Sequence, residues 1–353
     1  MFDNIYKNKT VLVTGDTGFK GSWLAIWLRE LGANVIGYAL EPKTEKDNYV
    51  ICGLENRIIH INGDVRDYHH LTSIFDKHKP EIVFHMAAQA LVLESYRDPL
   101  ETYGTNIMGT IDVLEAIRHS ESVTDAVIIT TDKCYENREW IYGYSENDRL
   151  GGKDPYSSSK AACEIVIKSY LESFFSKDGS ANIASARAGN VIGGGDWAEN
   201  RIVPDCIKSL MQKRPVDIRN PLAVRPWQHV LEPLSGYLKL GLLLHKKGKE
   251  FSGPWNFGPS TKSMVTVKQL VEEVINQWGE GEINIKTDAN QHSEAHLLYL
   301  DISKAINKLE WKPRLTFKEG IKYTVDEFKI EKFSIDQVYK QRVEHINNYC
   351  KIL

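Results

Sequence analysis

Short runs of apolar residues alternate, in the first half of the chain, with longer segments whose apolar residues recur every three or four positions. The short runs predict buried β-strands, and the longer segments predict amphipathic helices. The expected strands lie at residues 10–14, 34–40, 57–63, 81–88, 125–131 and 182–189. The expected helices lie near residues 20–31, 67–78, 100–119 and 156–175. Because strands that alternate with helices pair in parallel and are covered on both faces, this half predicts a doubly wound α/β sheet.

The pattern changes after Gly189, where three consecutive glycines and several prolines interrupt shorter elements. A chain of 353 residues is long enough for one large domain and a smaller one, since single cores stop growing at about 250–300 residues. The expected boundaries are 1–189 with a returning segment near 226–257 for the large domain, and 190–225 with 258–353 for a smaller α+β lobe.

Charge and hydropathy exclude several classes of partner. The net charge is -3 and the isoelectric point is about 6.4. These values give no electrostatic reason to expect binding to nucleic acid or to an anionic membrane, since either would call for a basic surface. The apolar stretches are far shorter than the roughly 20 residues that a membrane span needs. The N-terminus has no signal-peptide pattern, and we expect a cytoplasmic protein.

The five cysteines are scattered and never spaced as C-x-x-C, which favours neither a disulfide framework nor a zinc site. Cys134 and Cys163 lie near the segments discussed below. We interpret each as a small packing residue, because no neighbouring histidine would activate the thiol. The histidines show no H-E-x-x-H pattern, and no metal site is expected. The cysteines are Cys52, Cys134, Cys163, Cys206 and Cys350.

A glycine motif separates the first expected strand from the first helix. Gly15, Gly18 and Gly21 have the spacing G-x-x-G-x-x-G. Glycine lets the backbone turn tightly and approach a pyrophosphate, whose charge is favoured by the N–H groups and the positive dipole end of the next helix. A glycine triplet alone is weak evidence, but this one follows a strand and opens an amphipathic helix. The motif therefore predicts a Rossmann-type dinucleotide-binding domain.

The end of the second strand bears on the choice of dinucleotide. An acidic residue there holds the adenosine ribose of NAD. Glu41 follows the strand end at Leu40 and favours NAD, although an exposed loop position would accept a glutamate equally well. Asp64, after the third strand, is a candidate contact of the adenine, with a simple turn aspartate as the alternative.

The stretch "TTDKCY", residues 130–135, places Asp132 directly before Lys133 at the end of an apolar strand. Successive strand residues point to opposite faces, so both charges face one site only if the chain has already turned. A solvated loop with an ordinary ion pair is the alternative interpretation.

Tyr156 and Lys160 form a Y-x-x-x-K pair at the start of the helix that follows. Residues four apart share a helix face, so the lysine cation can lower the pKa of the phenol from its ordinary value of about 10. Such a spacing arises by chance in a chain with 16 tyrosines. Its position after the "TTDKCY" strand, in a chain with the glycine motif, is what gives it meaning.

Taken together and in this order, these features resemble the extended short-chain dehydrogenase/reductase family over about the whole chain. The features are the glycine triplet, "HMAAQ" (85–89), "TNIMGTIDVLEA" (105–116), Thr131 and Tyr156-x-x-x-Lys160. The resemblance implies that Tyr156 takes a hydroxyl proton while hydride passes to NAD. It implies that Lys160 binds the nicotinamide ribose and tunes Tyr156, and that Thr131 hydrogen-bonds the reacting oxygen. The cofactor contacts that we expect are Gly15, Thr17, Gly18, Phe19, Lys20, Gly21, Asp64, Val65, Ala87, Ala88, Tyr156 and Lys160.

Within that family, sugar nucleotide 4,6-dehydratases place Asp-Glu directly after the threonine, whereas this chain has Asp132-Lys133. With "RAGNVIGGGDWAENRIVPD" (187–205) and "RPWQHVLEPLSGYL" (225–238), this departure resembles the members that act on CDP-glucose. The resemblance implies that oxidation at carbon 4 makes the proton on carbon 5 acidic. Lys133 would then remove that proton while Asp132 protonates the departing hydroxyl of carbon 6. It also implies a homodimer in which the helices near 100–119 and 156–175 pair.

A lysine base must be neutral, although the ordinary pKa of lysine is about 10.4. Bringing this pKa near 7 costs roughly 4–5 kcal/mol of differential solvation or repulsion. Burial and Lys160 would lower the pKa of Lys133, and Asp132 would raise it.

Candidate contacts of the substrate are mostly basic. Guanidinium groups match phosphate oxygens in fork geometry, which makes Arg201, Arg219 and Arg225 candidates for the diphosphate, with a surface ion pair as the alternative for each. Asn190 is a candidate donor to the same phosphate, and Gln89 follows the strand end at which similar enzymes contact the sugar. Three other functions stay open: a sugar nucleotide 4-epimerase, a 4,6-dehydratase that acts on another nucleoside diphosphate glucose, and a dinucleotide-binding regulator without catalysis.

Overall fold

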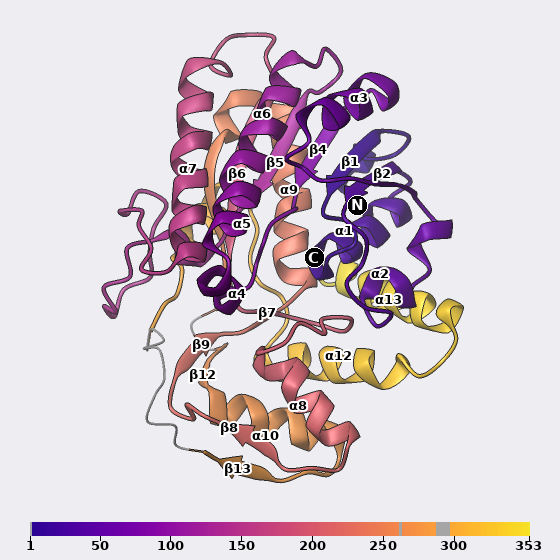
Figure 1. Ribbon diagram of the computed structural model, residues 1–353, viewed down its shortest axis with the longest axis vertical. Helices are drawn as coiled ribbons and strands as arrows, with labels where there is room; N and C mark the ends of the chain where they lie inside the picture. The colour runs from indigo at the N-terminus through magenta and orange to yellow at the C-terminus, as the bar shows by residue number, and fades with distance from the viewer. Residues whose placement is uncertain (1, 261–262, 287–296) are drawn as a thin grey trace.

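A seven-stranded parallel sheet forms the centre of the molecule (Figure 1). The computed structural model describes residues 2–260, 263–286 and 297–353. The strand order is β11-β6-β5-β4-β1-β2-β3, and the order reverses at β1, so the sheet is doubly wound. The predicted Rossmann-type α/β fold is therefore confirmed. The strands are β1 (Thr10–Thr14), β2 (Asn34–Ala39), β3 (Ile59–Asn62), β4 (Ile82–His85), β5 (Asp125–Ile129), β6 (Asn182–Ala188) and β11 (Gly253–Phe257).

The central strands are mostly apolar on both faces because helices cover both sides of the sheet. In β1, Val11 and Val13 belong to the hydrophobic cluster on one face, and Leu12 belongs to the cluster on the other. All five residues of β5 are buried. This is why the strands read as continuous apolar runs in the sequence rather than as alternating ones.

Helices from distant parts of the chain fill the two faces. The face of Leu12 packs against α3, α6 and α7, and the face of Val11 and Val13 packs against α1, α9 and α13. The helices are α1 (Phe19–Glu30), α2 (Asn48–Ile51), α3 (Tyr68–His78), α4 (Val92–Arg97), α5 (Pro99–Tyr103), α6 (Gly109–His119), α7 (Pro155–Ser173), α8 (Ile202–Met211), α9 (Leu231–Lys247), α10 (Val267–Trp278), α11 (Ser303–Lys308), α12 (Phe317–Ile330) and α13 (Ile335–Cys350).

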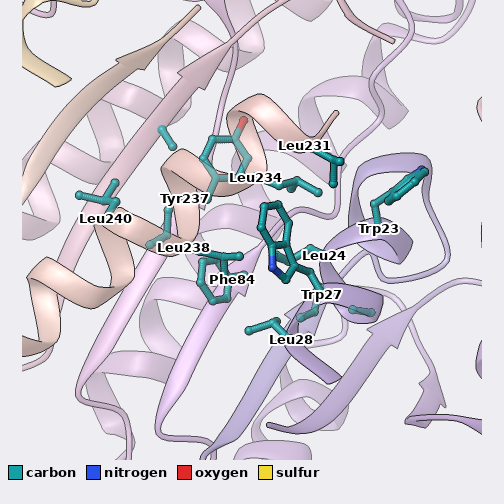
Figure 2. Close-up of a cluster of buried hydrophobic side chains, with 14 of the residues drawn as sticks. Trp23, Leu24, Trp27, Leu28, Phe84, Leu231, Leu234, Tyr237, Leu238 and Leu240 are labelled. Atoms are coloured by element: carbon teal, nitrogen blue, oxygen red, sulfur yellow. The ribbon is translucent and has the colours of Figure 1, made fainter. Parts of the chain in front are cut away.

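Figure 2 shows the cluster between α1, α9 and the sheet, where Trp27 lies among Leu234, Leu238 and Phe84. Trp27 also packs edge to face against Tyr349 of α13, with ring centroids 5.9 Å apart. The C-terminal helix thus contacts the nucleotide-binding half, although the expected division assigns its residues to the smaller lobe. That division stays a prediction. Across the described residues, no helix is both long and apolar enough to cross a membrane.

The smaller lobe lies at the lower end of Figure 1 and consists of helices and two-stranded sheets. Its core contains apolar residues of α8, α10 and α12. Parallel pairs join β7 to β10 and β8 to β13, and an antiparallel pair joins β9 to β12. These strands are β7 (Val191–Ile192), β8 (Val216–Ile218), β9 (Val224–Pro226), β10 (Gln228–His229), β12 (Met264–Thr266) and β13 (Ile283–Ile285).

The predicted helix at 100–119 is present but not regular. A π-helical turn, Gly104–Met108, separates α5 from α6. Within this turn, Asn106 is 1% exposed, and its side chain donates to the carbonyl of Gln89 and to Ser159 Oγ of α7. A prediction of one uninterrupted helix is therefore wrong at this turn, because the apolar periodicity does not reveal the hydrogen bonds that Asn106 makes across the fold.

Candidate active site

The carboxyl ends of the central strands meet at one edge of the sheet, and the predicted chemical residues lie there. The glycine motif follows β1, Thr131 follows β5, and Asn190 follows β6. Helix α7 brings Tyr156 to the same edge. Ligands of open parallel sheets bind at this edge, beside the strand at which the order reverses.

The first glycine loop, residues 15–21, is tight enough to require glycine. A Cβ on Gly21 would lie 2.0 Å from the carbonyl oxygen of Gly15, and a Cβ on Gly15, whose φ is +75°, would lie 2.7 Å from the amide nitrogen of Ala87. Helix α1 begins after Gly18 without a side-chain cap, so its first-turn N–H groups are open to an anion. The loop therefore fits the pyrophosphate of a dinucleotide.

A buried pair that sequence reasoning missed braces this loop. Asp16 Oδ2 lies 2.8 Å from His60 Nδ1 of β3, and the Asp16 carboxylate occupies the space where Gly37 has no side chain. Burial raises the pKa of Asp16, and His60 opposes that rise. Thr17 adds a hydrogen bond to the carbonyl of Leu40 at 2.9 Å. The signal in the sequence was an aspartate inside the glycine motif, which has no partner until the strands pair.

The residues expected at the adenosine end are engaged with neighbours. Asp64 accepts from the guanidinium of Arg66, whose hydrogen bonds lower the pKa of that carboxyl. Val65 is buried in contact with the first residue of α6, where a Cβ on Gly109 would lie 2.7 Å from Val65 Cγ2. Glu41 is exposed and accepts from Asn62 Nδ2 at 2.7 Å. Ala87, beside Ala88 at the end of β4, donates its N–H to Thr14 Oγ1 at 3.2 Å, so the backbone here borders the glycine loop.

His85 is a second buried residue that the sequence did not single out. Its ring nitrogens lie 2.7 Å from Thr14 Oγ1 and 3.2 Å from Thr110 Oγ1. Burial lowers the pKa of His85 to about 3, with the Lys160 cation adding to the effect, so this histidine is neutral. It fixes the ends of β1 and β4, which carry the two backbone segments that border the dinucleotide.

Helix α7 presents Tyr156 and Lys160 to the end of β5. The helix begins at Pro155, and Asp154 caps it by accepting from the N–H of Ser157 at 2.9 Å. Lys160 Nζ donates to the carbonyl of Ile129 at 3.2 Å. Burial raises the pKa of Tyr156 to about 12, against which a hydrogen bond with Thr131 works. The structure thus places Thr131 against Tyr156, with Lys160 bonded at the same strand end. The expectation that Lys160 lowers the pKa of Tyr156 below its ordinary value is wrong, because burial raises this pKa and Thr131 and Arg201 are the groups that oppose the rise.

The segment after β5 turns away from the strand, as the adjacent charges required. Residues Asp132–Cys134 form a single 3-10 turn. Asp132 is 2% exposed, accepts from Thr131 Oγ1 at 3.0 Å, and occupies the space where Gly189 lacks a Cβ. Lys133 is exposed. The turn therefore points the carboxylate into the site and leaves the lysine at its outer side, with no ion pair between them among the described contacts.

Lys20 reaches further into the site than the glycine loop alone requires. Burial lowers the pKa of Lys20 to about 8, and the cations of Lys160 and Arg201 lower it further. Asp132 and Asp196 oppose these effects. Charged groups on α7, after β5 and in residues 193–201 therefore all act on the pKa of Lys20.

Arg201 belongs to the second glycine loop, residues 193–201. Its Nη1 lies 2.8 Å from Asp196 Oδ2, and its charge works against the high pKa of Tyr156. Asn190 has the left-handed φ of 51°, and its carbonyl accepts from the N–H of Gln228. The structure thus places Arg201 beside the catalytic candidates.

The other substrate candidates lie in different surroundings. Arg225 lies in β9 and donates to the carbonyl of Val224 at 2.9 Å. Arg219 is exposed after β8. Gln89 uses its side chain within its own loop, donating to Thr102 Oγ1 at 2.8 Å and accepting from the N–H of Leu91 at 2.6 Å. Neither Arg219 nor Gln89 is among the groups that act on the pKa of Tyr156.

Comparisons with known proteins show which family the chain resembles. A family model of GDP-mannose 4,6 dehydratase matches residues 12–324. The chain is 48% identical over 322 residues to a CDP-glucose 4,6-dehydratase of Salmonella typhimurium, with 90% of each chain covered. It is 28% identical over 332 residues to a dTDP-D-glucose 4,6-dehydratase of Homo sapiens, covering 90% of this chain and 89% of that protein.

Solved structures have the same fold. A UDP-glucose 4-epimerase of Thermotoga maritima with UDP-glucose superposes with a TM-score of 0.76 at 27% identity, covering 90% of this chain and 97% of that one. A dTDP-glucose 4,6-dehydratase of Bacillus anthracis in complex with NAD gives a TM-score of 0.75 at 20% identity, covering 90% and 96% of the two chains. At that identity the second likeness shows the fold alone.

Proposed function

The chain belongs to the GDP-mannose 4,6-dehydratase family of extended short-chain dehydrogenases, and from that premise we propose that it converts CDP-glucose to CDP-4-keto-6-deoxyglucose and water. The observation that carries the proposal is Asp132, a buried carboxylate beside the tyrosine and threonine of the site. An epimerase needs the tyrosine but has no use for this acid. The relative at 48% identity acts, by its name, on CDP-glucose.

NAD is the cofactor, and when bound it would supply the hydride acceptor for carbon 4 of the glucose and the hydride donor for carbon 6. The first glycine loop would hold its pyrophosphate through the backbone and the first turn of α1. Lys160 would hold the nicotinamide ribose. The solved dTDP-glucose 4,6-dehydratase of the same fold is a complex with NAD.

Tyr156 removes the proton of the carbon 4 hydroxyl, and Thr131 hydrogen-bonds the same oxygen. A phenol with a pKa near 12 is a poor base at neutral pH, so the site must lower that pKa when substrate is present. Arg201 works in that direction, since its cation favours the phenolate.

Asp132 and Lys133 then remove water across carbons 5 and 6. Lys133 takes the proton of carbon 5, which the new carbonyl at carbon 4 has made acidic, and Asp132 gives a proton to the departing hydroxyl of carbon 6. Return of the hydride to carbon 6 and of a proton to carbon 5 completes the reaction without net oxidation. In the free enzyme the Lys133 side chain is exposed, so this role requires the bound sugar to draw it inward.

Arg201 and Arg225, with Asn190, bind the diphosphate in this proposal. Arg201 has the best support, because it lies beside Tyr156 and Lys20. Arg219 has less, because it is exposed after β8. Gln89 acts through its backbone or shapes the sugar pocket, because its side-chain amide is bonded within its own loop.

The enzyme works as a homodimer in the cytoplasm and supplies deoxysugar biosynthesis, including that of lipopolysaccharide O-antigen. Exposed apolar side chains gather on α4 to α7, the helices that would pair across a two-fold axis, and a dimer would bury them. If the free protein sediments as a monomer, the proposed homodimer is wrong. The side chains are Leu93, Tyr96, Leu100, Tyr103, Met108, Ile165 and Phe174.

A product assay tests the proposed reaction. CDP-glucose and dTDP-glucose are incubated separately with enzyme and NAD, and the sugar nucleotides are identified by mass spectrometry and NMR. We expect loss of one water from CDP-glucose and a much slower reaction of dTDP-glucose. Asp132→Asn should retain NAD binding and lose most dehydration. A product that has the mass of the substrate and an inverted carbon 4 would make the protein an epimerase.

A further inference from the structure

A buried ion pair lies beneath the catalytic segment 130–135 and contacts it at both ends. Arg187 Nη2 of β6 lies 2.7 Å from Glu164 Oε2 of α7, and the two side chains are 3% and 2% exposed. Glu164 Oε1 accepts from Thr130 Oγ1 at 2.5 Å, at the first residue of the segment. Arg187 Nη1 donates to the hydroxyl of Tyr135 at 2.6 Å, at its last residue.

Glu164 continues the row of residues through which α7 meets the end of β5. Tyr156, Lys160 and Glu164 are spaced four apart and share one helix face. Lys160 binds the carbonyl of Ile129, Glu164 binds the side chain of Thr130, and Tyr156 is hydrogen-bonded with Thr131. Three successive residues are thus each held by one residue of this row.

The other end of the segment is held from β6 and β11. The hydroxyl of Tyr135 donates to Asn256 Oδ1 at 2.8 Å, and the guanidinium carbon of Arg187 lies 5.0 Å from the centre of the Tyr135 ring. Arg187 Nη1 also donates to the carbonyl of Glu146 at 3.1 Å. Thr131, Asp132 and Lys133 therefore lie between two anchors that one ion pair joins.

The carboxylate of Glu164 is fully used. Besides Arg187 and Thr130 it accepts from Ser185 Oγ at 2.8 Å. Burial works to raise the pKa of Glu164, but Arg187 and these hydroxyl donors together lower it, so the carboxylate stays ionised. A buried ion pair is often no better for stability than an apolar pair of the same volume. Stability alone therefore gives little reason to place charges here, whereas the need to anchor a short 3-10 turn at both of its ends does.

We infer that Glu164 and Arg187 are positioning residues that fix the acid–base segment relative to Tyr156. The inference rests on the proposed function, since it assigns these two residues to the dehydration step. The anchor at Thr130 supports Thr131 and hence the oxidation step. The anchor at Tyr135 supports Asp132 and Lys133, so its loss should slow removal of water more than removal of hydride.

The test uses Tyr135→Phe, which removes one hydroxyl and keeps the ring in the core. In the full-length enzyme with NAD and CDP-glucose, we expect kcat to fall about tenfold or more with KM nearly unchanged, since small misplacements of reacting groups cost up to about a hundredfold. We also expect a larger steady-state fraction of reduced nicotinamide, because oxidation outpaces dehydration. Thr130→Val should lower kcat without that increase, and Glu164→Gln should lower both steps.

Glu232→Gln is the matched control. Glu232 is a buried carboxylate of α9 that accepts from Tyr349 and from the backbone of Arg314 and Leu315, away from the segment. The Glu232→Gln variant should have a lower thermal midpoint of unfolding. Its steady-state fraction of reduced nicotinamide, which reports the balance between oxidation and dehydration, should equal that of the wild type. If Tyr135→Phe changes only the thermal midpoint, as the control does, the positioning role is wrong. A wild-type enzyme that forms no dehydrated product overturns the proposed function, and the positioning role with it.

Discussion

The two glycine loops of the site are held in place by different means. In the first glycine loop, the backbone leaves no room for a side chain on Gly21, whose Cβ would overlap the carbonyl of Gly15. In the second, two carboxylates accept backbone N–H groups: Glu327 Oε2 of α12 from Gly194, and Oε1 of Glu331, the C-cap of that helix, from Gly195, both at 2.7 Å. The Gly15–Gly21 contact of the first loop joins residues six positions apart, although His60 and Ala87 also border that loop. The carboxylate contacts of the second loop join residues 133 and 136 positions apart.

Because their contacts differ, we expect the two loops to respond differently to substitutions. A methyl group should disrupt either loop, since a Cβ on Gly194 would lie 2.4 Å from Glu327 Cβ and one on Gly195 would lie 2.3 Å from Asn48 Cβ. Only the second should also fail when a carboxylate 133 or 136 positions away is removed, although the glycines themselves are intact. The loops meet at Lys20, on whose pKa both Lys160 and Arg201 act.

The largest effect is expected from Glu327→Ala. Glu327 is fully buried, lies 3.0 Å from His229 Nε2 and 2.8 Å from His345 Nδ1, and accepts from Gly194. Removing one partner of a buried charged cluster costs about 3–5 kcal/mol, which chemical denaturation would measure. Glu344→Ala, an exposed carboxylate of α13, is the control and should be nearly neutral.

The contrast between the loops also makes a prediction about binding for Glu327→Ala. The fraction that stays folded should bind NAD almost as wild type does, because the first glycine loop does not depend on this carboxylate. Affinity for CDP-glucose should fall, since Arg201 lies at the end of the second loop. Equal losses of both affinities, measured by calorimetry on folded protein, would mean that the loops are not held independently.

Gly21→Ala should have the next largest effect. The added Cβ would lie 2.0 Å from a backbone oxygen, which cannot move without opening the turn. Overpacking of this kind costs about 1–3 kcal/mol. We expect most of this cost to appear as weaker binding of NAD. Gly18→Ala is the matched control, because its Cβ would lie 3.3 Å from the same oxygen at a φ of -73° that alanine tolerates. Similar NAD affinities for the two variants would contradict the steric account.

The smallest effect is the pH dependence of NAD binding that Lys20 should produce. Burial lowers the pKa of Lys20 to about 8, so the cation is present below that pH and is lost above it. A cation beside the pyrophosphate favours binding, so NAD affinity should weaken as pH rises from 7 to 9, by about tenfold at most for each unit above the pKa. Lys20→Met should bind more weakly at pH 7 and show a flatter profile. An unchanged slope in that variant would assign the effect to another group.

The sign for stability is opposite to that for binding. The unfolded chain keeps Lys20 protonated up to about pH 10.4, so between about 8 and 10.4 it binds more protons than the folded protein does. The contribution of Lys20 to the free energy of unfolding therefore increases as pH rises through this window. Below pH 8 this residue adds no pH dependence.

The sequence predicted the parts of the site that are local. The glycine triplet and the Tyr156–Lys160 pair are patterns of seven and five residues, and their physics is confined to one turn and one helix face. The adjacency of Asp132 and Lys133 also predicted a turn after the strand, which the structure has. The alternation of strands and helices predicted the sheet for the same reason.

The supports of the site could not be predicted, because they join segments that meet only in the fold. No pattern near Gly194 predicts its contact with Glu327, which is 133 residues away. Likewise, no pattern near Asp16 predicts its contact with His60. The exposure of Lys133 was also outside the reach of the sequence, since it depends on the direction in which a single turn ends. Local patterns predicted the reacting groups, and tertiary contacts decide how firmly each is held.

Turnover of CDP-glucose in deuterated water with NAD, followed by mass spectrometry and NMR of the product, tests the central claim most directly. We expect the product to have lost one water and gained one deuterium at carbon 5, because a base must remove the carbon 5 proton and a deuteron from solvent must replace it. We also expect Lys133→Met to lose this deuterium together with the product. An epimerised sugar with no deuterium at carbon 5 would contradict the account, and would leave Asp132 and Lys133 without the acid and base roles proposed for them.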